Sequence, residues 1–196
     1  MKKMLFAIAV LAVMSFAKEE THNADIKAST IEWLGKKTTG QHGGMVAVKS
    51  GNLKLANGAP LSGEFVLDMT SISVTDIKDP DDNKSLVDHL KEDDFFCVQK
   101  FPTAVLTAKK FEKLATATAE ANYNVTADLT IKGVKNEIQF PALITTKGNT
   151  TNANAAIKID RTKWNITYKS KTVLGNMADK FIYDDIEFTV KLVLKK

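Results

Sequence analysis

Apolar and polar residues alternate along several stretches of the chain, with the period of two that is typical of a β-strand with one buried face. The alternation is clearest in residues 63–69, 121–132, 154–160 and 185–194. In residues 121–132 every second residue is Ala, Tyr, Val, Leu or Ile, and the residues between them are Asn, Thr, Asp or Lys. These stretches predict long amphipathic strands, and no second core pattern indicates another domain.

Short turn sequences lie where these strands should reverse direction. Gly and Asn tolerate the positive φ angles that tight hairpins need. We therefore expect turns at Ser50-Gly51-Asn52, Asn57-Gly58, Lys132-Gly133 and Lys147-Gly148-Asn149. Strands of about six to thirteen residues joined by such turns form an antiparallel meander.

One segment in the middle of the chain departs from the alternation. It begins with Asp and Pro, and its Leu86 and Leu90 lie on one helical face. We predict a helix of about two turns near Asn83–Lys91, with Asp82 or Asn83 as its N-cap. Acidic residues at its start suit the positive end of the helix dipole.

About eight long strands and one short helix predict an all-β fold, an antiparallel up-and-down barrel. Closure of the sheet removes the edge strands that would otherwise promote aggregation. An eight-stranded barrel is either filled by its own side chains or wide enough to hold one slender ligand. The strand pattern alone leaves both alternatives open, and the choice between them decides the function.

The N-terminus has the parts of a secretory signal. Two lysines precede the apolar run Met4–Met14, which leads into a small-x-small cleavage site at Ser15–Ala17. The apolar run is shorter than the roughly 20 residues of a membrane anchor. We predict an exported protein in which residues 1–17 are removed after Ala17 and residues 18–196 form one domain.

Removal of the signal also lowers the charge. The chain has 27 Lys and Arg against 23 Asp and Glu, and two of the lysines lie in the signal. The mature chain therefore has 25 basic and 23 acidic residues, a net charge of +2. This small excess, without a basic stripe interleaved with aromatic residues, argues against a nucleic-acid partner.

Acidic residues, a histidine and the only cysteine lie close together after the predicted helix starts. Asp88, His89, Asp93 and Asp94 precede Cys97, but the spacing contains no Cys-x-x-Cys or His-Glu-x-x-His pattern. We therefore expect no metal site. A single cysteine cannot form an internal disulfide, and the apolar neighbours of Cys97 favour a buried thiol.

The sequence carries no motif for nucleophilic catalysis. It has three histidines, no Gly-x-Ser-x-Gly elbow and no activating partner for its cysteine. We therefore expect no catalytic residues and no catalytic cofactor. A lipid hydrolase is the remaining enzymatic alternative, and its base-bearing motif is missing.

Five stretches together resemble the successive blocks of YceI-like proteins. The first has the form Trp-x-Gly-Lys-x-Thr-Gly-x-His-x-Gly, and the third has the form His-Leu-x-x-x-Asp-Phe-Phe-x-Val-x-x-Phe-Pro. They occur in order and cover the chain from about Ala28 to Leu194. The stretches are IEWLGKKTTGQHGGMVAVKSGNL, LSGEFVLDMTSI, LVDHLKEDDFFCVQKFPTA, ADLTIKGVKNEIQFP and IDRTKWNITY.

This resemblance implies a lipocalin-like barrel that is exported to the bacterial periplasm and binds a long polyisoprenoid chain inside. The family has been linked to isoprenoid-quinone handling and to stress responses, and it is not generally regarded as enzymatic. Sequestration or transport of such a lipid would involve transient contact with a membrane. The resemblance does not decide whether two copies of the chain form a homodimer. The chain departs from the family pattern at Cys97, Lys163 and Asn165. We expect these differences to change local contacts and not the fold.

The same resemblance suggests which side chains would meet the ligand. We expect the adjacent Phe95 and Phe96 to plug and shape one end of an elongated cavity. His42 and Arg161 would lie near the mouth, although Arg161 could instead tie a loop to carbonyl or carboxylate groups. The candidate lining residues are Trp33, Phe65, Leu67, Met69, Phe95, Phe96, Phe101, Leu129, Ile131, Phe140, Trp164, Ile186 and Phe188.

Overall fold

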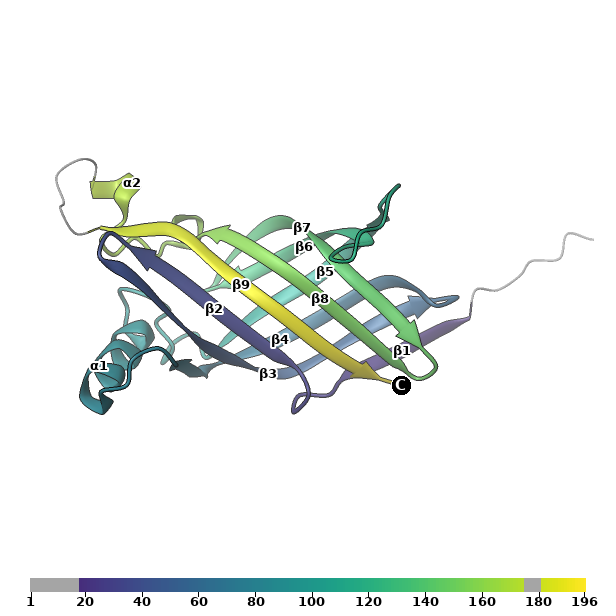
Figure 1. Ribbon diagram of the computed structural model, residues 1–196, viewed down its shortest axis with the longest axis horizontal. Helices are drawn as coiled ribbons and strands as arrows, with labels where there is room; N and C mark the ends of the chain where they lie inside the picture. The colour runs from purple at the N-terminus through teal and green to yellow at the C-terminus, as the bar shows by residue number, and fades with distance from the viewer. Residues whose placement is uncertain (1–17, 175–180) are drawn as a thin grey trace, which may run out of the picture.

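The computed structural model describes residues 18–174 and 181–196, and the predicted signal peptide lies outside these residues. Most of the described chain is β-strand, and two α-helices and one 3-10 helix lie near one end of the barrel (Figure 1). None of the helices within these residues is long and apolar enough to cross a membrane. The nine strands of the described residues are β1 (Glu19–Ala24), β2 (Thr30–Lys37), β3 (Gly40–Ala56), β4 (Ala59–Val74), β5 (Thr103–Lys113), β6 (Tyr123–Ile131), β7 (Val134–Lys147), β8 (Thr150–Asp160) and β9 (Ile182–Lys195).

Eight strands close into an antiparallel barrel. Each of the strands β2 to β9 pairs with the next strand in the chain, and β9 returns to pair with β2. The helix α1 (Pro80–Lys91) lies in the connection from β4 to β5. The β4–β5 and β9–β2 pairs are also antiparallel, so no sheet edge is left among these eight strands. The predicted up-and-down barrel with a short helix is confirmed.

The extra strand β1 continues the line of β2 along the barrel wall. β1 pairs with the second half of β3 and the end of β9, whereas β2 pairs with the first half of β3 and the start of β9. The break between them is a turn in which Ser29 N donates to Asp25 O at 3.0 Å. β1 and β2 therefore share one position in the barrel, and β1 covers the end opposite the helices (Figure 1).

Three of the four expected turns are present. Asn57 and Gly58 join β3 to β4 with φ angles of 52° and 80°, and Lys132 and Gly133 join β6 to β7 with 51° and 75°. Positive φ at both central residues is the requirement of a type I′ hairpin turn. The third turn, between β7 and β8, contains Gly148 with φ 57°.

The fourth expected turn, at residues 50–52, is wrong. β3 runs without reversal from Gly40 to Ala56, and near residues 50–52 its pairing with β4 shows only a register shift, between Val48 and Ser50. Gly51 lies opposite Phe65 of β4, and a Cβ atom at Gly51 would be 2.4 Å from the Phe65 ring. The glycine accommodates a neighbouring aromatic ring rather than a turn.

The helix α1 begins earlier than expected. Its N-cap is Asp79, whose carboxylate accepts hydrogen bonds from the backbone of Asp81 and Asp82 at 3.0 Å each. Pro80 occupies the first helical position, where its fixed φ and missing N–H cost nothing. The predicted start and N-cap are therefore wrong, while the predicted end at Lys91 is confirmed.

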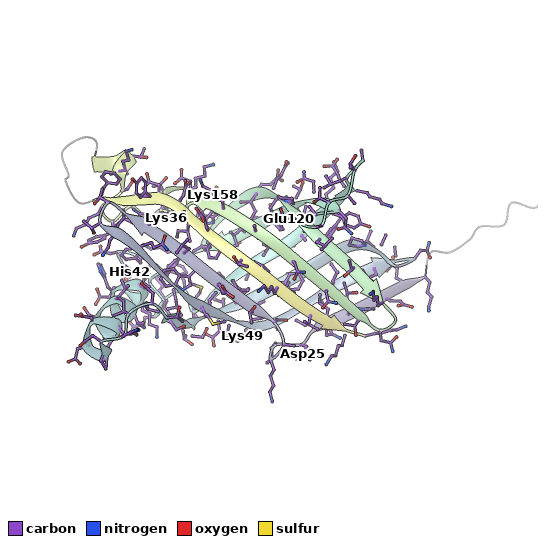
Figure 2. All side chains as sticks on the ribbon, viewed as in Figure 1. Asp25, Lys36, His42, Lys49, Glu120 and Lys158 are labelled. Carbon is purple, nitrogen blue, oxygen red and sulfur yellow. The ribbon has the colours of Figure 1, made fainter. Side chains whose placement is uncertain are left out.

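The strand alternation separates an apolar interior from a charged exterior. Exposed side chains such as Lys49 and Lys158 lie on the outside of the barrel (Figure 2). Val125, Ala127, Leu129 and Ile131 of β6 point inward and are buried, as the pattern of residues 121–132 predicts, and Tyr123 is half-buried. The inward Ile186, Phe188 and Val190 of β9 are only half-buried, because they face an internal cavity.

Candidate functional site

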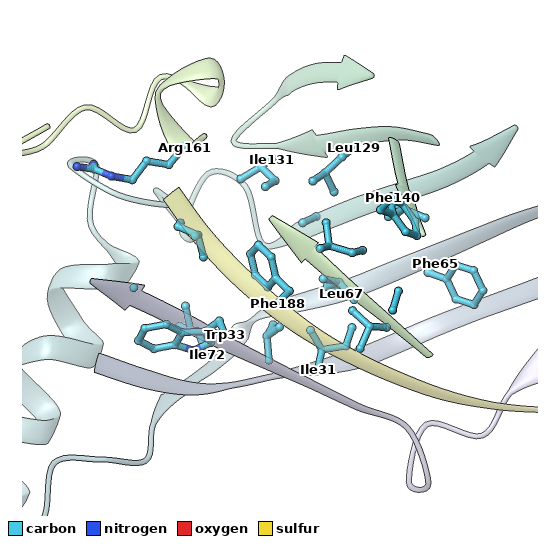
Figure 3. A pocket seen from close by; sticks show the side chains of 18 of the residues that line it. Ile31, Trp33, Phe65, Leu67, Ile72, Leu129, Ile131, Phe140, Arg161 and Phe188 are labelled. Carbon is cyan, nitrogen blue, oxygen red and sulfur yellow. The ribbon is translucent and has the colours of Figure 1, made fainter. Parts of the chain in front are cut away.

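The barrel encloses an apolar cavity of about 220 Å³. Side chains from all eight barrel strands and from α1 form its wall, and the larger ones lie along its length (Figure 3). One enclosed water needs only about 15 Å³, so this space can hold a sizeable apolar group. The interior is not filled by its own side chains.

Thirteen of the fifteen predicted site residues lie on the cavity wall. They come from six barrel strands, from the loop after α1 and from the segment after β8, and the cavity brings them together although they are distant in sequence. The residues on the wall are Trp33, His42, Phe65, Leu67, Met69, Phe95, Phe96, Leu129, Ile131, Phe140, Arg161, Ile186 and Phe188.

The other two, Phe101 and Trp164, are not among the lining residues. Trp164 is 1% exposed, and its indole Nε1 donates to Leu129 O at 3.0 Å, so it packs behind the wall of β6. The Phe101 ring covers the β6–β7 turn, where a Cβ atom at Gly133 would be 2.7 Å from it. Both aromatic residues support the barrel end from outside the cavity.

The loop after α1 explains the two adjacent phenylalanines. The backbone N–H of Phe96 donates to Leu90 O at 3.2 Å, and that of Val98 donates to Lys91 O at 2.9 Å, so the chain folds back on the helix end. This tight loop points Phe95 and Phe96 inward together, and both are buried on the cavity wall. A regular helix or strand would have directed one of two adjacent side chains elsewhere.

Phe95 also joins the two sides of this barrel end. Its ring lies 5.0 Å from the His89 ring of α1 and 5.5 Å from the Tyr168 ring of the segment after β8. His89 and Tyr168 meet edge to face at 4.7 Å. Such aromatic contacts contribute about 0.5–1.5 kcal/mol each beyond area burial, so this cluster fixes α1 over the end of the barrel.

Most polar residues of the cavity wall lie at the same end, and Asn154 of β8 is an exception. Lys37 and His42 flank the β2–β3 turn, and Arg161 and Asp185 flank the connection from β8 to β9. Strand pairing brings these segments together, because Lys37 lies opposite Ile182 and Asp160 opposite Asp185. We call this end the mouth.

Arg161 is a structural link in the mouth. It is 1% exposed, and its guanidinium donates to four backbone carbonyls, those of Ile166, Tyr168, Ile182 and Tyr183, at 2.9–3.3 Å. Burial lowers the pKa of the guanidinium, while nearby carboxylates oppose this shift. These contacts match the interpretation that this arginine ties a loop to carbonyl groups.

Asp184 completes this link. Its Oδ1 lies 3.5 Å from Arg161 Nη2, and its Oδ2 accepts hydrogen bonds from the backbone and hydroxyl of Thr172 at 3.2 and 2.5 Å. Burial alone would raise the pKa of Asp184, but hydrogen bonds and the charge of Arg161 outweigh it and lower that pKa. The carboxylate is therefore held ionised beside the arginine.

His42 is held at the opposite side of the mouth. Its Nδ1 lies 2.9 Å from Asp76 Oδ2, and Asp76 Oδ1 accepts the backbone N–H of Gly43 at 3.0 Å. Burial would raise the pKa of Asp76, but these hydrogen bonds outweigh it and lower that pKa. The imidazole is therefore oriented by its carboxylate partner while it remains on the cavity wall.

Several small residues of the wall are missing from the predicted set. Alanines of β5, β7 and β8 face the cavity, and their short side chains leave the space that larger residues would fill. The strand alternation places them inward, but we had singled out only large apolar residues. These alanines are Ala104, Ala108, Ala142, Ala153 and Ala155.

The end opposite the mouth is packed. Leu55 and Leu194 are 1% and 0% exposed and do not line the cavity. Beside them the buried His22 places Nδ1 3.1 Å from the Thr151 hydroxyl, which in turn lies 2.9 Å from the Thr146 hydroxyl. His22 Nε2 has no hydrogen-bond partner within the described residues. We call this end the closed end.

One residue of the acidic cluster, Asp93, lies beside the Cys97 thiol. Within residues 18–174 and 181–196, no three His, Cys, Asp or Glu side chains are placed to hold a metal ion. The Cys97 thiol lies 2.7 Å from Asp93 Oδ1, and this hydrogen bond, burial and the carboxylate charge raise the pKa of the thiol. Cys97 is buried, as its sequence neighbours predict.

Comparisons with known proteins agree with this fold. A family model described as a YceI-like domain matches residues 22–194. No curated protein matches the chain. Because the solved structures described next are under 25% identical, they show the likeness of the fold alone.

Three solved structures illustrate this likeness. Burkholderia cenocepacia BcnA is 21% identical with a TM-score of 0.60, over 87% of this chain and 98% of that one. A polyisoprenoid binding domain from Saccharophagus degradans, implicated in plant cell wall breakdown, is 16% identical with a TM-score of 0.62, over 92% and 99%. The Campylobacter jejuni YceI protein is 19% identical with a TM-score of 0.54, over 100% and 93%.

Proposed function

Because the chain belongs to the YceI-like family, we propose that it binds the tail of a long-chain isoprenoid lipid inside its barrel. Binding is passive and involves no catalytic step. The protein sequesters or carries the lipid in the periplasm, after export and removal of residues 1–17, and exchanges it during transient contact with a membrane. The polyisoprenoid binding described for the Saccharophagus degradans domain supports the choice of ligand class.

The observation that carries this proposal is the apolar cavity with its single polar end. A prenyl tail is a slender apolar chain, and burial of each CH₂ group is worth about 0.8 kcal/mol. Such a tail needs no hydrogen bonds along the wall, where Leu67, Leu129 and Phe188 offer only apolar surface (Figure 3). The polar groups of the mouth are placed where a head group would remain.

The mouth residues differ in how many of their hydrogen-bond donors are already used within the protein. The guanidinium of Arg161 already donates to four carbonyls. Lys37 lines the cavity on the face of β2 that also carries Trp33, and His42 keeps its Nε2 side away from Asp76. We therefore assign head-group contact to Lys37 and His42 and a supporting role to Arg161.

Two neighbouring alanines of β8 provide a matched test. Ala155 faces the cavity, whereas Ala156 is exposed on the outer surface. Ala155→Phe should obstruct the lumen, and Ala156→Phe should add the same side chain outside it. The measurement is native mass spectrometry of each protein after incubation with a linear isoprenoid alcohol in mild detergent.

We expect the alcohol to bind to the unchanged protein and to Ala156→Phe and not to Ala155→Phe. Unfolding curves of both variants check that the barrel is intact. Equal binding by the two variants would place the ligand outside the cavity and contradict the proposal. Intact-mass measurement of the exported protein tests the cleavage after Ala17 separately.

A further inference from the structure

We propose that Phe65 forms the inner end of the ligand cavity and sets the longest isoprenoid tail that the barrel accepts. This inference rests on the proposed function, because it concerns the length of the tail that the same cavity binds. It follows from the place of Phe65 along the cavity and from two glycines that hold its ring.

Phe65 lies far from the mouth. Among the labelled side chains of Figure 3 it is at the opposite end from Arg161, with Phe140 next to it. It is 8% exposed and belongs to the cavity wall. Leu53, opposite Gly63 and one step closer to the closed end, is 2% exposed and still lines the cavity, whereas Leu55 beyond it does not. The ring therefore lies close to the change from open lumen to the packed closed end.

Two glycines position this ring. Gly51 of β3 pairs directly with Phe65, and a Cβ atom there would be 2.4 Å from ring atom Cδ1. Gly63, two residues before Phe65 on β4, would place a Cβ atom 3.3 Å from Cε2. The ring thus lies against bare backbone, as aromatic residues do over glycines in designed sheets.

The contact between the Phe65 ring and Gly51 predicts that substitutions of these two residues change the length of the bound tail in opposite directions. Phe65→Ala removes the phenyl ring and adds its volume to the inner end of the cavity, which is room for about one isoprene unit. Gly51→Ala adds a methyl group where the ring now lies, so the ring must move into the lumen. The first change should lengthen the preferred tail and the second should shorten it.

The backbone of Gly51 permits this test, because its φ lies outside the left-handed region that favours glycine. Phe65→Trp provides a second way to shorten the lumen if Gly51→Ala unfolds the barrel. Phe188→Ala is the matched control, since Phe188 lies midway along the cavity and its removal widens the lumen without extending it (Figure 3).

The experiment is a competition among linear isoprenoid alcohols that differ by single isoprene units. Each protein is incubated with an equimolar mixture in the same detergent, and native mass spectrometry gives the distribution of bound lengths. We expect the most abundant length to increase by about one unit in Phe65→Ala, since one phenyl ring and one isoprene unit are of similar size. It should decrease in Gly51→Ala or Phe65→Trp and not increase in Phe188→Ala.

The double variant Gly51→Ala/Phe65→Ala sharpens the result. Without the ring the added methyl group meets no side chain within 4 Å among its three nearest atoms, and its remaining close neighbour is Glu64 O at 3.1 Å. The double variant should therefore bind lengths like those of Phe65→Ala. Bound alcohols of unchanged length in every variant would overturn this inference and leave the proposed function standing. If the unchanged protein bound no isoprenoid alcohol, the proposed function would fail and this inference with it.

Discussion

The mouth and the closed end of the barrel are built from the same strands but differ in packing. At the closed end Leu55, Leu194 and Thr151 are at most 1% exposed and leave no space. At the mouth the chain leaves the sheet, and α1, the Phe95–Phe96 loop and the segment fixed by Arg161 lie around the polar side chains of the cavity wall. The tightest packing is therefore at the closed end, and the cavity extends from there toward the mouth.

Arg161 stabilises the segments that form the mouth. Its replacement should therefore have the largest effect on the free energy of unfolding. Arg161→Ala leaves four backbone carbonyls without their donor and Asp184 without its ion-pair partner, which should cost about 3–5 kcal/mol in the free energy of unfolding. Arg161→Lys keeps the charge but not the planar set of donors, so its cost should be smaller, roughly 1–3 kcal/mol. Urea unfolding of the three proteins measures both values.

The same two variants separate support from ligand contact. If Arg161 only supports the mouth, Arg161→Lys should keep its affinity for an isoprenoid alcohol under conditions where it is fully folded. A large loss of affinity with unchanged stability would instead assign the guanidinium to the head group.

Substitution of one leucine at the closed end and one on the cavity wall tests the difference in packing. Leu55→Ala creates a new cavity in the packed closed end and should cost about 2–5 kcal/mol. Leu67→Ala enlarges a cavity that already exists, so fewer packing contacts are lost, and we expect less than about 2 kcal/mol. Urea unfolding without ligand gives both values, and equal costs would contradict an empty lumen beside Leu67.

Much of the barrel was predictable because strand direction and turn chemistry are local properties. The alternation in residues 121–132 assigns inward and outward faces, and Asn57-Gly58 and Lys132-Gly133 need positive φ whatever the rest of the chain does. The adjacent Phe95 and Phe96 also lie on the cavity wall as the resemblance implied.

What could not be predicted depends on contacts between distant segments. The alternation gives the direction of a side chain but not the volume left between opposite walls, so the role of Ala142, Ala153 and Ala155 was missed. The local sequence around Gly51 predicts a turn. The residue must be glycine for a different reason, because the ring of Phe65 on the next strand leaves no room for a Cβ atom. The early start of α1 had a local signal, Pro80 at the first helical position, which was overlooked.

Protonation of Asp184 at low pH should lower the free energy of unfolding. Its pKa is lowered in the folded protein, so its stabilising contribution is present above the unfolded pKa of about 3.9 and is lost as pH falls through the folded pKa. The free energy of unfolding should therefore decrease less steeply below about pH 4 in Asp184→Asn than in the unchanged protein. Asp185→Asn, at a neighbouring exposed position, is the control.

The smallest effect concerns the thiol beside the mouth. Asp93 raises the pKa of Cys97, and only the thiolate reacts with alkylating agents. Asp93→Asn should therefore increase the rate of Cys97 alkylation at pH 8 several-fold without changing the barrel. Mass spectrometry of samples quenched at successive times measures the rate, and an unchanged rate would show that burial alone protects the thiol.

The proposed function requires an open apolar lumen that accepts an isoprenoid tail. A crystal structure of the protein purified from its native host tests this requirement. Our account predicts continuous, tube-shaped density inside the barrel, running from the Lys37 and His42 side of the mouth to the ring of Phe65. Wall side chains that meet across the barrel and leave no room for such density would contradict it.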